Sequence, residues 1–418
     1  MERLVIEGQK PLHGKIKISG AKNAVLPLMA AALLAEGTHQ FSNVPNLRDV
    51  ATMQKLLAHF GIPSRREGTT LTLTTNGLST HEAPYDLVKT MRASVLALGP
   101  LLTRWGRAKV SLPGGCAIGA RPVNLHLDAL KKMGAEIKVE EGYVWARSKR
   151  LRGAEIFFET VTVTGTENVM MAAALAQGTT VLKNAAREPE IGDLADYLNK
   201  MGAKIAGAGT DVIQIEGVEE LKPAQHAAIA DRIEAATFLM AGAVTGGEVT
   251  VGNCPPDYLG EALRLLRETG CEIKILDAHQ ITLNAPRKLK SVNLTTAPFP
   301  GLATDLQAQF MALMTLADGI STIVETIFEN RFQHALELNR LGADIKLDGH
   351  RAVVRGVKKL SGAPLMATDL RASASLILAG LAAQGTTTVD RAYHIDRGYE
   401  RIEEKLEGLG ARIKRTRD

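Results

Sequence analysis

Apolar and polar positions repeat along this chain with a long period. A leucine followed four residues later by glycine closes each of six amphipathic runs with helical spacing, and the runs lie about 70 residues apart. Glycine commonly ends a helix because it accepts left-handed backbone angles. An alternating apolar segment, typical of a strand, follows most of these glycines. The six pairs are Leu57 and Gly61, Leu130 and Gly134, Leu198 and Gly202, Leu266 and Gly270, Leu338 and Gly342, and Leu406 and Gly410.

A second glycine marks the end of a more apolar helix in each repeat. Runs rich in alanine and leucine end at this glycine, and a β-branched segment follows, such as residues 179–182 or 386–389. Each repeat therefore predicts a helix, a strand, a turn, a helix and two strands. Six such units, three in each half of the chain, predict an α/β fold with two similar domains. The glycines are Gly37, Gly106, Gly178, Gly247, Gly319 and Gly385.

The repeats also predict where the domains begin and end. A break near residues 222–230, which contains Pro223, separates the two halves. The opening segment, residues 4–19, has two strand-like runs without a preceding helix. We interpret this segment as a half-unit that completes the last repeat of the second half. The predicted domains are therefore residues 21–228, and residues 1–20 together with residues 229–418.

The long apolar helices are expected to begin at residues 22, 92, 166, 231, 304 and 368, and positive side chains stand at several of these starts. Lys22, Arg92, Arg232 and Arg371 occupy these positions, although the helix macrodipole opposes a cation there. A repeated local violation of this kind is typical of a functional site. A helix N-terminus reinforced by Lys or Arg is well suited to bind an anion. The pattern therefore predicts a cleft between the domains for a substrate with several negative charges, lined further by the turn residues Arg121, Arg331 and Arg397.

Composition narrows the class of protein. Aromatic residues make up only 4% of the 418 residues, which argues against an aromatic platform for single-stranded nucleic acid. The net charge is +5 without a long Lys/Arg block, and no P-loop motif occurs. The three cysteines lack metal-ligand spacing. The N-terminus lacks a signal peptide, and the longest apolar run, residues 24–35, is too short to span a bilayer. We expect a cytoplasmic enzyme.

One loop combines a cysteine with dense glycine. Residues 113–125 contain Cys116, three glycines around it, and Arg121. A nearby cation favours the thiolate form of a cysteine, so this loop is a candidate for chemistry. Taken alone, it is equally compatible with a surface turn that happens to contain cysteine. Asp305 and Asp369 have a similar ordinary interpretation as helix N-caps.

Several motifs together resemble a known family along essentially the whole chain. They are residues 19–23 (Ser-Gly-Ala-Lys-Asn), 112–122 (which include Pro-Gly-Gly-Cys and Gly-Ala-Arg-Pro), 186–191, 304–309, 328–332 and 368–372. The chain resembles the UDP-N-acetylglucosamine 1-carboxyvinyltransferases, enolpyruvyl transferases that open peptidoglycan synthesis. The resemblance implies two inside-out α/β barrel domains, each of three repeated units, with the active site between them. This implied architecture agrees with the repeats.

The resemblance also implies a reaction. Enolpyruvyl would be transferred from phosphoenolpyruvate to the 3′-hydroxyl of UDP-N-acetylglucosamine, with release of phosphate. No metal or organic cofactor is expected, and neither nucleic acid nor membrane is an expected partner. The family's cysteine loop is the target of the epoxide antibiotic fosfomycin, so we expect the same of Cys116.

Residue roles follow from the same resemblance. Addition to the enol needs a proton for its methylene carbon and removal of one from the sugar hydroxyl. Cys116 is the expected acid, and Asp305 is the expected base or orienting group. Phosphate and carboxylate of phosphoenolpyruvate are expected at Lys22, Arg121, Arg331, Arg371 and Arg397, of which Lys22 and Arg397 also count as catalytic. Further substrate contacts are expected from Asn23, Arg92, Pro122, Val123, Asn124, Leu125, Thr162, Val163, Thr164, Glu188, Ile327 and Asp369.

Two positions depart from the family pattern, and two other functions are open. Asn124 stands where aspartate is common, and Thr160 stands where a lysine often contacts the diphosphate. The nearest alternative is the sister enzyme that uses shikimate 3-phosphate, which lacks a comparable cysteine loop. The other alternative is a non-catalytic relative that binds UDP-sugars and regulates the pathway.

Overall fold

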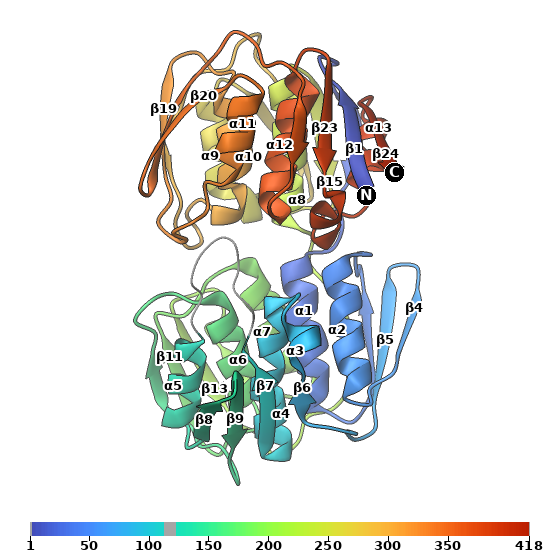
Figure 1. Ribbon diagram of the computed structural model, residues 1–418. Helices are drawn as coiled ribbons and strands as arrows, with labels where there is room; N and C mark the ends of the chain where they lie inside the picture. Colours follow the sequence, from blue (N-terminus) through green and yellow to red (C-terminus); the bar gives the residue numbers. More distant parts are fainter. Residues whose placement is uncertain (1, 113–122, 418) are drawn as a thin grey trace. The chain divides into compact units, whose positions relative to one another are not determined.

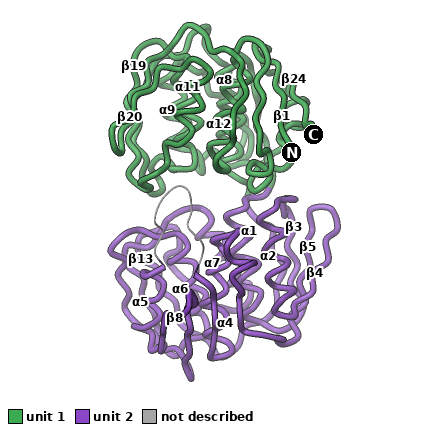
Figure 2. The backbone as a smooth tube through the Cα atoms, viewed as in Figure 1, with its two compact units in different colours: residues 1–19, 116–120, 230–418 green, residues 20–115, 121–229 purple. Residues whose placement is uncertain are grey.

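The chain folds into two compact units. The computed structural model describes residues 2–112 and 123–417. Of these, residues 20–112 and 123–229 form one unit, and residues 2–19 and 230–417 form the other (Figure 2). The chain passes from one unit to the other after Ser19 and again after Ile229.

Each unit contains three four-stranded sheets with the same internal plan. In every sheet one edge strand pairs in parallel with its neighbour, and the other two pairings are antiparallel. In the unit of residues 20–229 the sheets, each beginning with its parallel edge strand, are β14 (Gln225–Ala227), β3 (Gly37–Ser42), β5 (Thr70–Thr75) and β4 (Ser64–Glu67); β6 (Glu82–Ala83), β7 (Arg107–Ser111), β9 (Tyr143–Arg147) and β8 (Glu136–Glu140); and β10 (Glu155–Phe157), β11 (Thr179–Lys183), β13 (Val212–Glu216) and β12 (Lys204–Ala206).

The second unit repeats this plan with strands from both ends of the chain. Its sheets are β22 (Pro364–Met366), β23 (Thr386–Asp390), β1 (Glu2–Glu7) and β24 (Arg412–Arg417); β2 (His13–Lys17), β15 (Glu248–Gly252), β17 (Gln280–Asn284) and β16 (Glu272–Asp277); and β18 (Leu294–Thr295), β19 (Ile320–Val324), β21 (Arg351–Arg355) and β20 (Asp344–Asp348). The opening segment therefore contributes one strand to each of two sheets. β1 completes the last repeat between β23 and β24, whereas β2 joins β15 of the first repeat in this unit.

Apolar helices lie inside the sheets, as the family resemblance implies for an inside-out α/β fold. In α8 and α12 nearly every residue is buried, so these helices are covered on all sides. Figure 1 shows α10 and α12 with β19 and β20 on one side, and with β23 and β1 on the other. The inner helices are α1 (Lys22–Ala31), α4 (Leu98–Trp105) and α6 (Val163–Ala173) in one unit, and α8 (Arg232–Thr245), α10 (Gln307–Met314) and α12 (Leu370–Ala382) in the other.

The second helix of each repeat is amphipathic and packs one face on this core. These helices are α2 (Arg48–His59), α5 (Asn124–Lys132), α7 (Pro189–Lys200), α9 (Gly260–Glu268), α11 (His334–Arg340) and α13 (Ile402–Gly408). The glycine after each helix has φ between 90° and 103°, so the six predicted helix ends are confirmed. Short helical segments complete the chain: η1 (Ala32–Leu34), α3 (Tyr85–Val88), η2 (Arg92–Ala97), η3 (Pro256–Leu259), η4 (Thr304–Leu306) and η5 (Ala392–Arg397).

Three helix starts differ from those that the sequence pattern indicates. The segment at Arg92 is the 3₁₀ turn η2, and α4 begins only at Leu98. In the same way, the segment at Thr304 is the 3₁₀ turn η4, and α10 begins only at Gln307. The helix expected from Thr166 begins at Val163, because the Thr162 hydroxyl caps it by accepting a hydrogen bond from the Gly165 amide at 3.2 Å. None of the described helices is both long and apolar enough to cross a membrane.

Close packing at the repeat ends gives a stability prediction. A Cβ on Gly217 would lie 1.7 Å from the carbonyl oxygen of Ala176, whereas a Cβ on Gly192 would meet nothing within 4 Å. We expect Gly217→Ala to destabilise its unit by about 1–3 kcal/mol or more, because backbone must move. Gly192→Ala, inside α7, should instead stabilise by about 0.5–1 kcal/mol. Urea unfolding of both variants tests this, and equal midpoints would contradict it.

Candidate active site

A carboxylate held between two arginines is the main polar feature of the unit of residues 230–417. Asp305 lies in η4, Arg331 in the turn before α11, and Arg371 in the first turn of α12. Oδ1 of Asp305 accepts a hydrogen bond from Nη2 of Arg331 at 2.7 Å, and Oδ2 accepts from Nη2 of Arg371 at 2.9 Å. Asp305 and Arg331 from one repeat and Arg371 from the next therefore meet near the starts of the inner helices α10 and α12.

Both arginines are almost completely buried. Their side chains are 4% exposed, compared with 26% for Asp305. Nη1 of each arginine makes no hydrogen bond among the described residues. Because buried donors normally have partners, these two nitrogens are suited to the oxygen atoms of an anionic ligand.

Neighbouring groups fix the orientation of Arg371. Oδ1 of Asp369 accepts from the amides of Arg371 and Ala372 at 2.8 and 3.0 Å, so this carboxylate caps α12. The Arg371 guanidinium also lies over the Tyr399 ring, 5.3 Å from its centroid. Asp369 is thus placed as a cap beside the arginine, and its predicted substrate contact stays a prediction.

Arg397 belongs to the same end of α12. It is the last residue of η5, and the next residue, Gly398, lies so close to Leu370 that a Cβ would be 2.7 Å from that side chain. Leu370 is the first residue of α12. Arg397 is half-buried, and the contact of Gly398 with Leu370 places its backbone near the start of α12.

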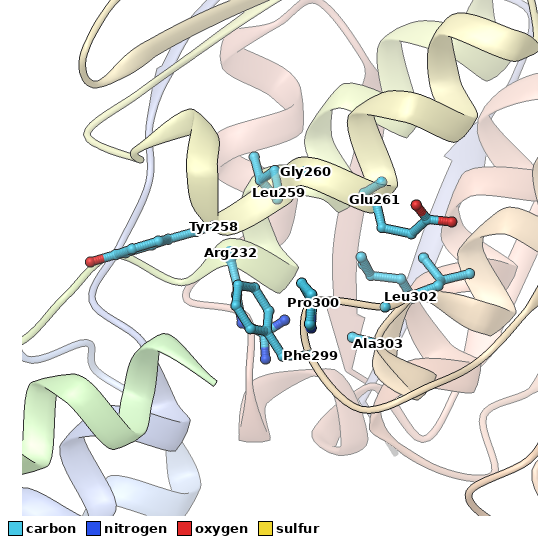
Figure 3. Close-up of a pocket in the computed structure, with 12 residues that line it drawn as sticks. Arg232, Tyr258, Leu259, Gly260, Glu261, Phe299, Pro300, Leu302 and Ala303 are labelled. Atoms are coloured by element: carbon cyan, nitrogen blue, oxygen red, sulfur yellow. The ribbon is translucent and has the colours of Figure 1, made fainter. Parts of the chain in front are cut away.

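Arg232 lies against the turn that precedes Asp305. Its guanidinium is 5.6 Å from the centroid of the Phe299 ring (Figure 3). A small pocket here is bordered by Tyr258 and residues 259–262 on one side and by residues 299–303 on the other. Arg232 therefore has a stacking role in this unit.

The other unit contains its own pair at a helix start. Lys22 is the first residue of α1, and Nζ lies 3.2 Å from Oδ2 of Asp49 in α2. Their side chains are 13% and 5% exposed. The buried carboxylate offsets the charge of a lysine that the helix dipole disfavours. Asn23 follows Lys22 in the first turn of α1.

A histidine that the sequence pattern did not single out contacts one of the predicted substrate residues, Thr164, in this unit. Nδ1 of His126 accepts from Nδ2 of Asn168 at 3.0 Å, so Nε2 bears the hydrogen and faces the Thr164 hydroxyl at 3.3 Å. Burial, together with the charge of Arg92, lowers the pKa of His126 to about 3. The imidazole is therefore neutral, and it orients Thr164 at the start of α6. A single histidine on an apolar helix face gives no sequence signal for this role.

The remaining predicted residues lie at helix starts or outside the described part of the chain. Glu188 is the N-cap of α7 and is 8% exposed, and Asn124 and Leu125 open α5 directly after Val123. Thr162 and Val163 open α6, and Ile327 lies in the turn after β19. Cys116, Arg121 and Pro122 lie outside the described residues. Among the described residues no group of three or more His, Cys, Asp or Glu side chains is arranged to bind a metal ion.

Comparison with known proteins places this arrangement in a family. The family model described as EPSP synthase (3-phosphoshikimate 1-carboxyvinyltransferase) matches residues 6–406. The chain belongs to this enolpyruvyl transferase family. Curated relatives named UDP-N-acetylglucosamine 1-carboxyvinyltransferase include those of Myxococcus xanthus strain DK1622, 57% identical over 420 residues, and Anaeromyxobacter sp. strain Fw109-5, 58% identical over 422 residues, each covering 100% of both chains.

Solved structures confirm the fold of the family. The enolpyruvyl transferase NikO from Streptomyces tendae matches with a TM-score of 0.88 at 27% identity, over 99% of each chain. EPSP synthase from Acinetobacter baumannii matches with a TM-score of 0.78 at 18% identity, over 100% of each chain. This enolpyruvyl transferase therefore shares its overall fold with both solved structures.

The neutral His126 gives a pH prediction for this enolpyruvyl transferase. Because its folded pKa, about 3, lies below the ordinary value of 6.5, the unfolded chain takes up the proton first as the pH falls. Its contribution to stability is complete above pH 6.5 and is lost toward pH 3, by about 1.4 kcal/mol per pH unit. His126→Gln should therefore lose less stability than the wild type between pH 7 and pH 5 in urea unfolding. An unchanged loss would contradict the assignment.

Proposed function

We propose that this enolpyruvyl transferase moves the enolpyruvyl group of phosphoenolpyruvate to the 3′-hydroxyl of UDP-N-acetylglucosamine and releases phosphate. This is the first committed step of peptidoglycan synthesis, and we place it in the cytoplasm. The observation that supports this function most strongly is the full-length identity of 56–58% with relatives named UDP-N-acetylglucosamine 1-carboxyvinyltransferase. The matching EPSP synthase structure is only 18% identical, which disfavours shikimate 3-phosphate as the acceptor.

The proposed reaction is an addition followed by an elimination. The Cys116 thiol gives a proton to the methylene carbon of phosphoenolpyruvate, and the sugar oxygen bonds to the adjacent carbon. The resulting tetrahedral intermediate then loses phosphate from that carbon and returns a proton from the new methyl group to the Cys116 thiolate, which restores the double bond and the thiol. Lys22, Arg121 and Arg397, together with the two arginines at Asp305, bind the phosphate and carboxylate groups and stabilise the charge that develops.

Asp305 has a geometry that suits the sugar hydroxyl. Two guanidinium groups stabilise its ionised form, so it accepts a hydrogen bond well and is a weak base. We assign it to orienting the 3′-hydroxyl and to accepting the proton only as the carbon–oxygen bond forms. Asn23, Arg92, Thr162, Val163, Thr164, Glu188 and Ile327, together with residues 122–125, are assigned to the UDP-sugar.

Acceptor specificity tests the proposed function. The purified chain should release phosphate from phosphoenolpyruvate when UDP-N-acetylglucosamine is present, and should not do so with shikimate 3-phosphate. A coupled phosphate assay measures both. Turnover with shikimate 3-phosphate alone would assign the chain to the sister activity. Binding of the UDP-sugar without any turnover would assign it a non-catalytic role.

The acid role of Cys116 gives a second test. Fosfomycin should label Cys116 covalently, faster in the presence of UDP-N-acetylglucosamine, and mass spectrometry should locate the adduct. Cys254 and Cys271 are internal controls, because both are buried and burial raises the pKa of the Cys271 thiol.

Cys116→Ala should retain UDP-sugar affinity and lose roughly 10²–10⁴-fold in turnover, as is usual for a general acid. Unchanged turnover, or an adduct on either buried cysteine, would overturn the role.

A further inference from the structure

One buried carboxylate connects the turn that contains Ile327 with the segment that immediately precedes Asp305. Glu325 directly follows β19 and is 1% exposed. Among the described residues it forms no ion pair, and the hydrogen bonds that it accepts come from neutral donors. A buried carboxylate is costly unless such donors are supplied, which makes the identity of its donors informative.

The two oxygens of Glu325 face different segments. Oε1 accepts from the Thr296 hydroxyl at 2.9 Å and from the amides of Ile327 and Phe328 at 2.8 and 3.2 Å. Oε2 accepts from the Thr304 hydroxyl at 2.8 Å. One side chain therefore connects the turn after β19 with both ends of the segment of residues 296–304.

Further bonds reinforce the Thr296 side of this connection. The Thr296 hydroxyl accepts from the Thr326 amide at 2.9 Å, and the Thr326 hydroxyl donates to the Thr296 carbonyl at 2.6 Å. Among the described residues, the Thr304 hydroxyl makes a single hydrogen bond, the one to Oε2 of Glu325. Loss of Oε2 as an acceptor would therefore release Thr304 selectively.

Thr304 is the residue immediately before Asp305. We propose that Glu325 is a positioning residue for the acceptor sugar, which sets the location of Asp305 relative to Ile327 through Thr304 and the two turn amides. This inference rests on the proposed function, in which both residues contact the sugar. Catalysis is sensitive to such placement, because a displacement of about 1 Å can cost about 100-fold in rate.

Two nearly isosteric substitutions test the Thr304 connection. Glu325→Gln keeps one carbonyl oxygen, which the three donors at Oε1 would retain, and replaces the bond from the Thr304 hydroxyl to the Oε2 carboxylate oxygen with a weaker neutral one, in which the hydroxyl accepts from the amide NH₂. Thr304→Val removes the hydroxyl from the other side. Each should lower kcat/KM for UDP-N-acetylglucosamine by roughly 10–100-fold, with a smaller change in the KM for phosphoenolpyruvate. Thr304→Ser keeps the hydroxyl and should restore most of the activity.

A double-mutant cycle separates positioning from general damage. If both substitutions act through the same bond, Glu325→Gln with Thr304→Val should be little worse than the worse single variant. The matched control is Glu337→Gln, since Glu337 in the same unit also accepts a backbone amide, that of Met366 at 2.9 Å. This control should have wild-type kinetics.

The outcomes are distinguishable. A lower melting temperature with wild-type kcat and KM in Glu325→Gln would assign Glu325 to folding only and overturn the proposal. Independent, multiplying effects of Glu325→Gln and Thr304→Val would also overturn it. Failure of the wild-type chain to use UDP-N-acetylglucosamine would instead overturn the proposed function. The two failures are distinguishable because wild-type turnover is measured first, and the effects of the variants are then measured relative to it.

Discussion

Helices that are apolar on every side impose the architecture of each unit. α8 and α12 expose almost no surface, and a helix of this kind must be covered in all directions. A single sheet covers one face, so three sheets are needed, and three repeats supply one sheet and one inner helix each. The equivalent placement of the repeats brings the starts of α10 and α12 together, as the ion pairs of Asp305 with Arg331 and Arg371 demonstrate. The polar site is thus a consequence of how the apolar helices are buried.

Burial also explains why charged groups at these helix starts are informative. A guanidinium that is 4% exposed is stable only with compensating partners. Asp305 accepts hydrogen bonds from some of the N–H groups of each guanidinium. Among the described residues Nη1 of both arginines has no partner, so it is available for the oxygens of a substrate. In the other unit Asp49 compensates Lys22 in the same manner. The cations are therefore held in place before any substrate binds, and this lowers the cost of ordering them during the reaction.

The repeats could be predicted from sequence because their determinants are local. A leucine and a glycine four residues apart encode a helix end, and all six of these glycines have left-handed angles. The cations at helix starts were visible for the same reason. Thr162 moved the start of α6 because capping depends on one hydroxyl and not on the apolar pattern. Glu325 and His126 were not predicted. Their side-chain partners lie 21 to 42 residues away in sequence, and a lone Glu after a strand resembles an ordinary exposed turn residue.

The position of β1 has a consequence for biosynthesis. Residues 20–229 contain every strand of their own three sheets, so that unit is complete once they leave the ribosome. β1 can pair only after β23 and β24 have been made, because Val5 of β1 pairs with Thr388 of β23 and with Lys414 of β24. At translation rates of about 5–20 residues per second, the wait is roughly 20–80 s. Until then Leu4 and Ile6, both 0% exposed in the folded chain, lack the strands that cover them, so a strand that is made early is among the last to be protected from proteolysis and aggregation.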